Sequence, residues 1–116
     1  MSSKSKPEEI VRQHLLAQML GPLGFPKGLV AVEKKISFGR RADIIVYLRD
    51  GTPLLLIECK ATCADEEVAF RQAVGYNASL AAPFWCIAHG SGVRTFWTGG
   101  SVPFLPPYKQ LLLRIL

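Results

Sequence analysis

The chain has few cysteines, few acidic residues and no long apolar run, and each shortage excludes a class of protein. Its 116 residues include three cysteines, Cys59, Cys63 and Cys86, an odd number without CxxC spacing. We therefore expect reduced thiols in a cytoplasmic protein, not a disulfide framework or a zinc knuckle. The longest apolar stretches lie around Leu54–Ile57 and Leu80–Ala88. Both are far shorter than the roughly 20 residues that cross a bilayer, so we expect no membrane partner.

Basic residues outnumber acidic ones, and this balance narrows the possible partners. Fourteen Lys and Arg against nine Asp and Glu give a net charge of +5 and a pI near 9.4. That balance permits binding to nucleic acid or to an anionic membrane surface. No expected helix combines a basic face with a broad apolar face, which argues against the membrane surface. With 49% hydrophobic residues, residues 1–116 are expected to form one domain with a flexible tail over residues 1–6 and no signal peptide.

The hydrophobic pattern predicts a helix, three strands, a helix and a strand, followed by shorter C-terminal elements. The expected helices span residues 7–20 and 65–80, and the expected strands span residues 29–36, 42–49, 53–60 and 84–88, with a further strand at 93–98 and a short helix within 106–116. The apolar stripe of the first helix is expected to be Ile10, Val11, Leu15, Leu16, Met19 and Leu20. Three strands before a helix predict an α/β fold with a mixed sheet flanked by helices.

A hairpin signal, Asp50-Gly51, joins the second and third expected strands. In a two-residue turn Arg49 would pair with Thr52, and counting outward places Asp43 opposite Glu58. Directly opposed residues have Cβ atoms about 4.5–5.5 Å apart, so the two carboxylates would repel each other without a compensating cation. The period of two puts Lys60 on the face of Glu58. A bulge or a longer turn would move Asp43 away from Glu58.

Two acids and a lysine in one place predict a site for a hard divalent cation. Mg²⁺ prefers oxygen ligands and keeps several waters, so one or two carboxylates suffice; Mn²⁺ is the expected substitute. Such a metal polarises a phosphodiester and helps to ionise an attacking water. Lys60 could orient that water or stabilise the charge that develops on the phosphorus oxygens. The two histidines, His14 and His89, lack partners at metal-ligand spacing and are expected to have ordinary surface or structural roles.

The segments Arg41-Ala42-Asp43 and Ile57-Glu58-Cys59-Lys60 resemble the signature of PD-(D/E)XK nucleases, with Ala42 where the signature has proline. The wider string, over roughly residues 7–90, resembles the N-terminal nuclease domain of type I restriction enzyme R subunits. Further residues support this resemblance: Pro7, Glu8, Glu9, Glu33, Ala61, Gln72, Tyr76 and Asn77. It implies a restriction-endonuclease-like fold and a Mg²⁺-dependent endonuclease that hydrolyses DNA phosphodiester bonds in restriction-modification or DNA processing.

The resemblance also implies roles for single residues. Asp43 and Glu58 would bind the metal, Lys60 would be catalytic, and Glu9 would be a further acid near the metal. Gln72 and Tyr76 would belong to a helix that supports the site or touches DNA.

Purely structural roles stay open as alternatives for several of these residues. Glu58 and Lys60 could form an exposed ion pair at a strand end. Glu9 could serve only the helix dipole, with Glu33 as an alternative third acid. Gln72 could make a structural hydrogen bond to the backbone.

DNA is the expected partner. The residues expected to contact its phosphates are Lys34, Lys35, Arg40, Arg41 and Arg71. One such site cuts one strand, so we expect a homodimer or a larger nuclease complex. A second hypothesis is a non-catalytic DNA-binding or subunit-interaction module that keeps the nuclease fold.

Overall fold

The computed structural model describes residues 5–35 and 41–116, with the backbone alone at residue 65. The elements in chain order are α1 (Lys6–Leu20), η1 (Lys27–Leu29), β1 (Val30–Lys35), β2 (Arg41–Tyr47), β3 (Pro53–Cys59), η2 (Cys63–Asp65), α2 (Glu66–Leu80), β4 (Phe84–His89), β5 (Gly92–Trp97), β6 (Gly100–Val102) and α3 (Tyr108–Ile115). The predicted order of helix, three strands, helix and strand is confirmed. The short edge strand β6 was not predicted, whereas α3 lies within the segment predicted to hold a C-terminal helix.

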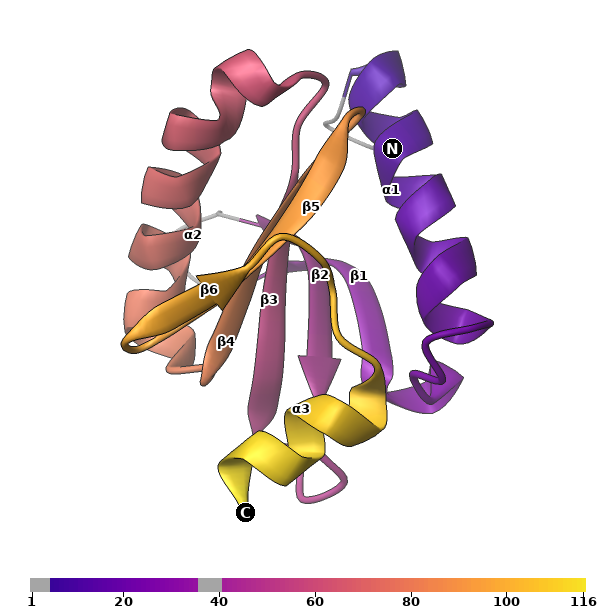
Figure 1. Ribbon diagram of the computed structural model, residues 1–116, viewed down its shortest axis with the longest axis vertical. Helices are drawn as coiled ribbons and strands as arrows, with labels where there is room; N and C mark the ends of the chain where they lie inside the picture. The colour runs from indigo at the N-terminus through magenta and orange to yellow at the C-terminus, as the bar shows by residue number, and fades with distance from the viewer. Residues whose placement is uncertain (1–4, 36–40) are drawn as a thin grey trace.

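The strands form one mixed sheet of order β1-β2-β3-β4-β5-β6 (Figure 1). Neighbouring strands are antiparallel except β3 and β4, which are parallel and joined by the crossover through α2. Parallel neighbours need such a crossover, and a helix in it covers one face of the sheet. This arrangement confirms the predicted α/β architecture of a mixed sheet flanked by helices.

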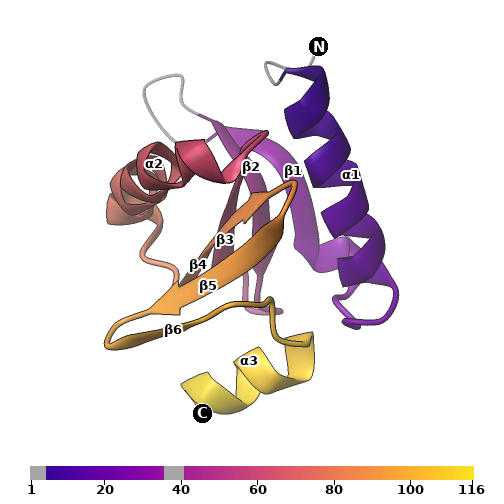
Figure 2. The same cartoon turned by 45° about the horizontal axis from the view of Figure 1, so that its top comes forward.

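The two faces of the sheet are covered by different helices. Figures 1 and 2 show α1 and α2 on opposite sides of the sheet, with α3 across one end. One apolar cluster joins α1 and α3 to the sheet and includes Leu15, Met19 and Leu111. The other cluster packs Ala69 and Ala73 of α2 against the opposite face. None of the helices in the described part of the chain is long and apolar enough to cross a membrane.

The first turn of α1 is closed by a capping box that was not predicted from the sequence. The Ser5 side chain accepts a hydrogen bond from the Glu8 amide, and Glu8 Oε1 accepts one from the Ser5 amide at 3.1 Å. The predicted apolar stripe of α1 is wrong at Ile10 and Leu20, whose side chains are exposed. The positions that face the sheet include Arg12 instead, which is buried.

Candidate active site at the end of β3

Asp43 of β2 and Glu58 of β3 lie on neighbouring strands at the end of β3 that leads to α2. The antiparallel register pairs Ile44 with Ile57 and Ile45 with Leu56, and the same offset places Asp43 opposite Glu58. Both side chains are buried, with exposed fractions of 3% and 2%.

The Asp43 carboxylate is also bonded directly to β3. The backbone N–H of Cys59 donates a hydrogen bond of 2.6 Å to Asp43 Oδ2. This bond from a backbone amide orients the carboxylate toward the strand that carries Glu58.

The predicted opposition of Asp43 and Glu58 agrees with the strand register, although the predicted two-residue turn is wrong. The turn has three residues, because the Leu48 amide donates to the Thr52 carbonyl at 2.7 Å and the Gly51 amide donates to the Leu48 carbonyl at 2.9 Å. Arg49 therefore does not pair with Thr52. The register then shifts between Val46 and Tyr47, where β3 contributes one extra residue. The longer turn moves the pairing of the two strands by one position, and the bulge moves it back by one. Asp43 therefore lies opposite the same residue, Glu58, as in an ideal two-residue hairpin.

Lys60 follows β3 directly and lies on the same face as Glu58 by strand alternation. Its backbone N–H donates to the Ala88 carbonyl at 2.8 Å, which continues the contact between β3 and β4. Its side chain is half-buried, and no ion pair joins it to any residue in the described ranges. The alternative of an exposed Glu58–Lys60 ion pair is therefore not observed, because Glu58 is buried.

The helix α2 covers the face of the sheet that carries these residues. Its partly buried Tyr76 packs against the apolar cluster of that face, which includes Ile45, Leu56 and Ile87. Gln72, one turn earlier, has a buried Oε1 that accepts no hydrogen bond from any residue described by the structure. The alternative of a structural hydrogen bond to the backbone is thus not observed for this oxygen among those residues.

The two candidates for a third acid, Glu9 and Glu33, are both held by Arg12 of α1. The buried Arg12 guanidinium pairs with Glu9 Oε2 and, at 3.1 Å, with Glu33 Oε1. The hydrogen bond from Arg12 lowers the pKa of the Glu9 carboxyl. Burial alone would lower the pKa of Arg12, but its hydrogen bonds with the two carboxylates outweigh burial and raise it.

Glu33 reaches Arg12 through an unusual backbone conformation. Val32 pairs with Ile44 and Lys34 pairs with Ala42, so regular alternation would put Glu33 on the face of Asp43. Its φ of 51° lies in the left-handed region, which breaks the alternation in β1. The carboxylate is thereby tied to the α1 side of the molecule.

Fewer than three metal-type ligands converge in the part of the chain that the structure describes. No group of three or more His, Cys, Asp and Glu side chains there could hold a metal ion. The donors that the register brings together are the carboxylates of Asp43 and Glu58. Two carboxylates with water in the remaining positions fit the way Mg²⁺ is usually bound. The role of Glu9 as a metal ligand stays a prediction.

His89, which lies beside Lys60, and its partner Glu66 were not predicted as part of this region. The parallel register pairs Cys59 with Ala88, and the same offset places His89 next to Lys60. His89 Nδ1 accepts a hydrogen bond from the Ser91 amide, and Nε2 faces Glu66 Oε2 at 3.3 Å. The available signal was the parallel crossover itself, which aligns the ends of β3 and β4.

The predicted DNA-contacting residues differ in their surroundings. Lys34, Lys35 and Arg41 are exposed at the ends of β1 and β2 nearest the site. Arg40 lies outside the described residues. Arg71 is exposed and pairs with Glu67 at 2.8 Å, one turn earlier on α2.

Comparisons with known proteins agree with this architecture. A solved fragment assigned as an HsdR subunit of a type I restriction enzyme from Vibrio vulnificus superposes with a TM-score of 0.74 at 17% sequence identity. The match covers 98% of this chain and 26% of that one, so this chain spans about a quarter of its length. No curated protein matches the chain. The family model described as the type I restriction enzyme R protein N terminus matches residues 7–98. The chain therefore belongs to the family of type I restriction enzyme R protein N termini.

Proposed function

We propose that this domain is a Mg²⁺-dependent endonuclease that hydrolyses DNA phosphodiester bonds as the nuclease part of a restriction system. The observation that carries the proposal is the pair of buried carboxylates, Asp43 and Glu58, at the end of adjacent strands. Burial of two like charges is unfavourable unless a cation or other partners compensate them. Family membership supplies the restriction context.

Asp43 and Glu58 are the proposed metal ligands. When bound, the metal would supply Lewis-acid activation of the scissile phosphate and of the attacking water. The hydrogen bond from the Cys59 amide would hold Asp43 in position for this role.

Lys60 is the proposed catalytic residue. Its ammonium group, free of ion pairs with described residues, can donate a hydrogen bond to the attacking water or to a phosphate oxygen as negative charge develops. Gln72 of α2, whose side-chain oxygen is buried, would support the site from the helix that covers this face. Tyr76 would hold the position of α2 through packing.

The DNA backbone is the proposed substrate contact. The exposed side chains of Lys34, Lys35 and Arg41 can neutralise phosphates close to the end of β3, and Arg40 belongs to the same proposed set. Such contacts position a duplex without reading its sequence. Assembly into a homodimer or a larger complex would bring a second site to the second strand.

The test is cleavage of plasmid, linear duplex and single-stranded DNA with Mg²⁺, with Mn²⁺ and with a chelator. Lys60→Ala should abolish cleavage while DNA binding in the chelator stays close to that of the unchanged protein. Asp43→Asn keeps an acceptor for the Cys59 amide but removes a negative charge, so it should abolish cleavage and weaken metal binding. Lys109→Ala, at an exposed position of α3, is the matched control for loss of one positive charge. Loss of cleavage in this control, or full cleavage by Lys60→Ala, would contradict the proposal.

A non-catalytic DNA-binding or subunit-interaction module is the second candidate. The observation in its favour is that Arg12 holds both Glu9 and Glu33, which leaves two carboxylates for a metal. A calorimetric titration with Mn²⁺ separates the two candidates. The nuclease should bind the ion through Asp43 and Glu58 and lose binding in Asp43→Asn, whereas a pure scaffold should give no heat in either protein.

A further inference from the structure

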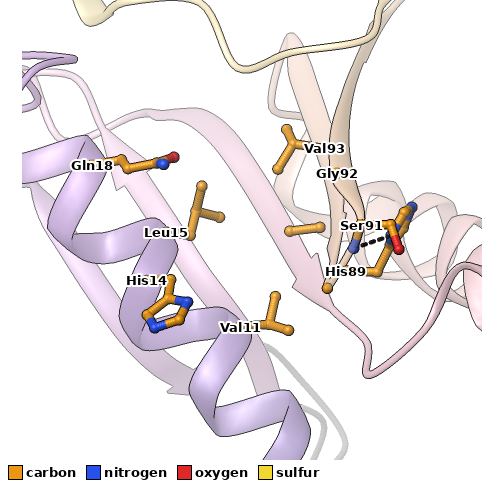
Figure 3. A pocket seen from close by; sticks show the side chains of 10 residues that line it. Val11, His14, Leu15, Gln18, His89, Ser91, Gly92 and Val93 are labelled. Atoms are coloured by element: carbon orange, nitrogen blue, oxygen red, sulfur yellow. Dashed lines mark hydrogen bonds between the residues drawn. The ribbon is translucent and has the colours of Figure 1, made fainter.

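A pocket lies on the face of the sheet opposite to the one that carries Asp43 and Glu58. It has a volume of about 310 Å³ and lies between α1 and the hairpin of β4 and β5. Figure 3 shows Val11 and Leu15 of α1 and Val93 of β5 around its centre. Ligand pockets in proteins range over roughly 300–1,000 Å³, so this one suits a ligand of nucleoside size and no larger.

The lining of this pocket offers hydrogen-bonding side chains at its rim. His14 and Gln18 lie on the α1 side, and Ser91 lies on the opposite side in the turn Gly90-Ser91-Gly92 (Figure 3). None of these three side chains is hydrogen-bonded to a residue that the structure describes. Each can therefore donate to or accept from a ligand.

The described residues that line the pocket include no Asp, Glu, Lys or Arg. An anionic group inside would meet no lysine or arginine of that wall, and a cationic ligand would meet no carboxylate of it. The wall instead fits a neutral, flat ligand that packs on aliphatic side chains and has donors and acceptors on its edge.

We infer that this pocket binds a single unpaired nucleobase. A base has a flat apolar face for Val11, Leu15 and Val93, and its edge can meet Gln18 and Ser91. The imidazole of His14 can stack on the base, as aromatic side chains do with unpaired bases. The phosphates stay outside the pocket, whose described lining has no Lys or Arg, and the net charge of +5 favours a polyanion there.

The base can come from a free nucleotide or from a single strand, and the two sources are distinguished by the probes. Binding is measured by calorimetry in a chelator, so that cleavage does not interfere and the outcome is independent of nuclease activity. The probes are deoxyadenosine monophosphate, a single-stranded pentanucleotide with one central adenine between abasic positions, and the fully abasic pentanucleotide. The pentanucleotide with a base should bind at least about tenfold more tightly than the abasic one, because stacking of one base on a protein side chain changes the affinity by about that factor.

The variant that tests the pocket is the double change His14→Ala and Gln18→Ala. Both positions are exposed on α1, and alanine favours helix, so the fold should persist, as circular dichroism can verify. The double variant should lose the preference for the base-containing strand. Gln110→Ala, an exposed glutamine of α3, is the matched control and should retain it.

Each outcome of this experiment is decisive. Tight binding of the monophosphate assigns the pocket to free nucleotides, and binding of the strand alone assigns it to single-stranded nucleic acid; both support the inference. Equal affinity for the abasic and base-containing strands overturns it. So does undiminished base preference in the double variant.

Discussion

Replacement of Arg12 by methionine should destabilise the protein far more than loss of an exposed arginine. The Arg12 side chain is 6% exposed and pairs with Glu9 and Glu33, whose side chains are 33% and 23% exposed. Breaking a fully buried ion pair costs about 3–5 kcal/mol, because the remaining charge is left without a partner. Water reaches both carboxylates here, so we expect the loss of Arg12 to cost about 2–3 kcal/mol. Methionine retains most of the aliphatic packing, which isolates the charge effect.

This loss corresponds to a clear thermal shift. With an unfolding entropy of about 2.1 cal/mol/K per residue, 2–3 kcal/mol lowers Tm by about 8–12 °C for a chain of this length. Thermal unfolding followed by circular dichroism gives the measurement. The matched control is Arg71→Met on α2, because Arg71 pairs with Glu67 at 2.8 Å while both side chains are more than 75% exposed. An exposed helical pair contributes about 0.5 kcal/mol, so the control should shift Tm by about 2 °C.

The pH dependence provides a second check on the same contact. The pKa of Glu9 is lowered from 4.5 in the folded protein, chiefly by its hydrogen bond with Arg12. A lowered carboxyl pKa stabilises the fold above the unfolded value, and the effect is lost as pH falls through the folded value. The gap in Tm between Arg12→Met and the unchanged protein should therefore be widest above pH 4.5 and shrink in stronger acid. A gap that is independent of pH, or no larger than that of Arg71→Met, would refute the reasoning.

Two further predictions concern the thiols and the hairpin turn. In the folded protein a thiol reagent should modify Cys63 alone, since Cys59 and Cys86 are fully buried and burial raises the pKa of Cys86 to about 12. Mass spectrometry should then find one label per chain, and three after unfolding in urea; rapid labelling of a second cysteine would contradict the buried positions. Gly51→Ala should destabilise by about 1 kcal/mol, because φ at this position is 89° and a side chain is strained there. Gly28→Ala, with open space and no positive φ, should instead raise the urea midpoint slightly, because alanine restricts the unfolded chain, and equal effects of the two would rule out backbone strain as the cause.

The parts of the fold that depend on local pattern could be predicted from the sequence. Both long helices and the first four strands occur in the predicted order, because apolar periodicity and Gly or Pro breaks mark them directly. The opposition of Asp43 and Glu58 was also predicted, but from a turn that the structure does not have. In Leu54-Leu55-Leu56 every side chain is apolar, so no alternation reveals where the extra residue of the bulge lies.

The long-range contacts of the candidate site could not be predicted. Arg12 lies one turn after Glu9 on a helix, and nothing nearby in the sequence indicates that it also pairs with Glu33 on an irregular strand. The position of His89 beside Lys60 depends on the register of a parallel crossover, which follows from the packing of α2 and not from local propensity. Such contacts are set by the sheet as a whole.

The extra residues of the hairpin between β2 and β3 lie outside the regular ladder that leads to Asp43 and Glu58. Loss of one residue from the three-residue turn would leave a two-residue hairpin closed by the same pair, Leu48 and Thr52, so Asp43 would keep its place. Loss of a residue from the segment 44–46 would instead slide the end of β2 by one position and turn Asp43 to the reverse side of the ribbon, away from Lys60. Natural variation in chain length should therefore collect at the turn and at the bulge, and a designer can shorten the loop but not the strand.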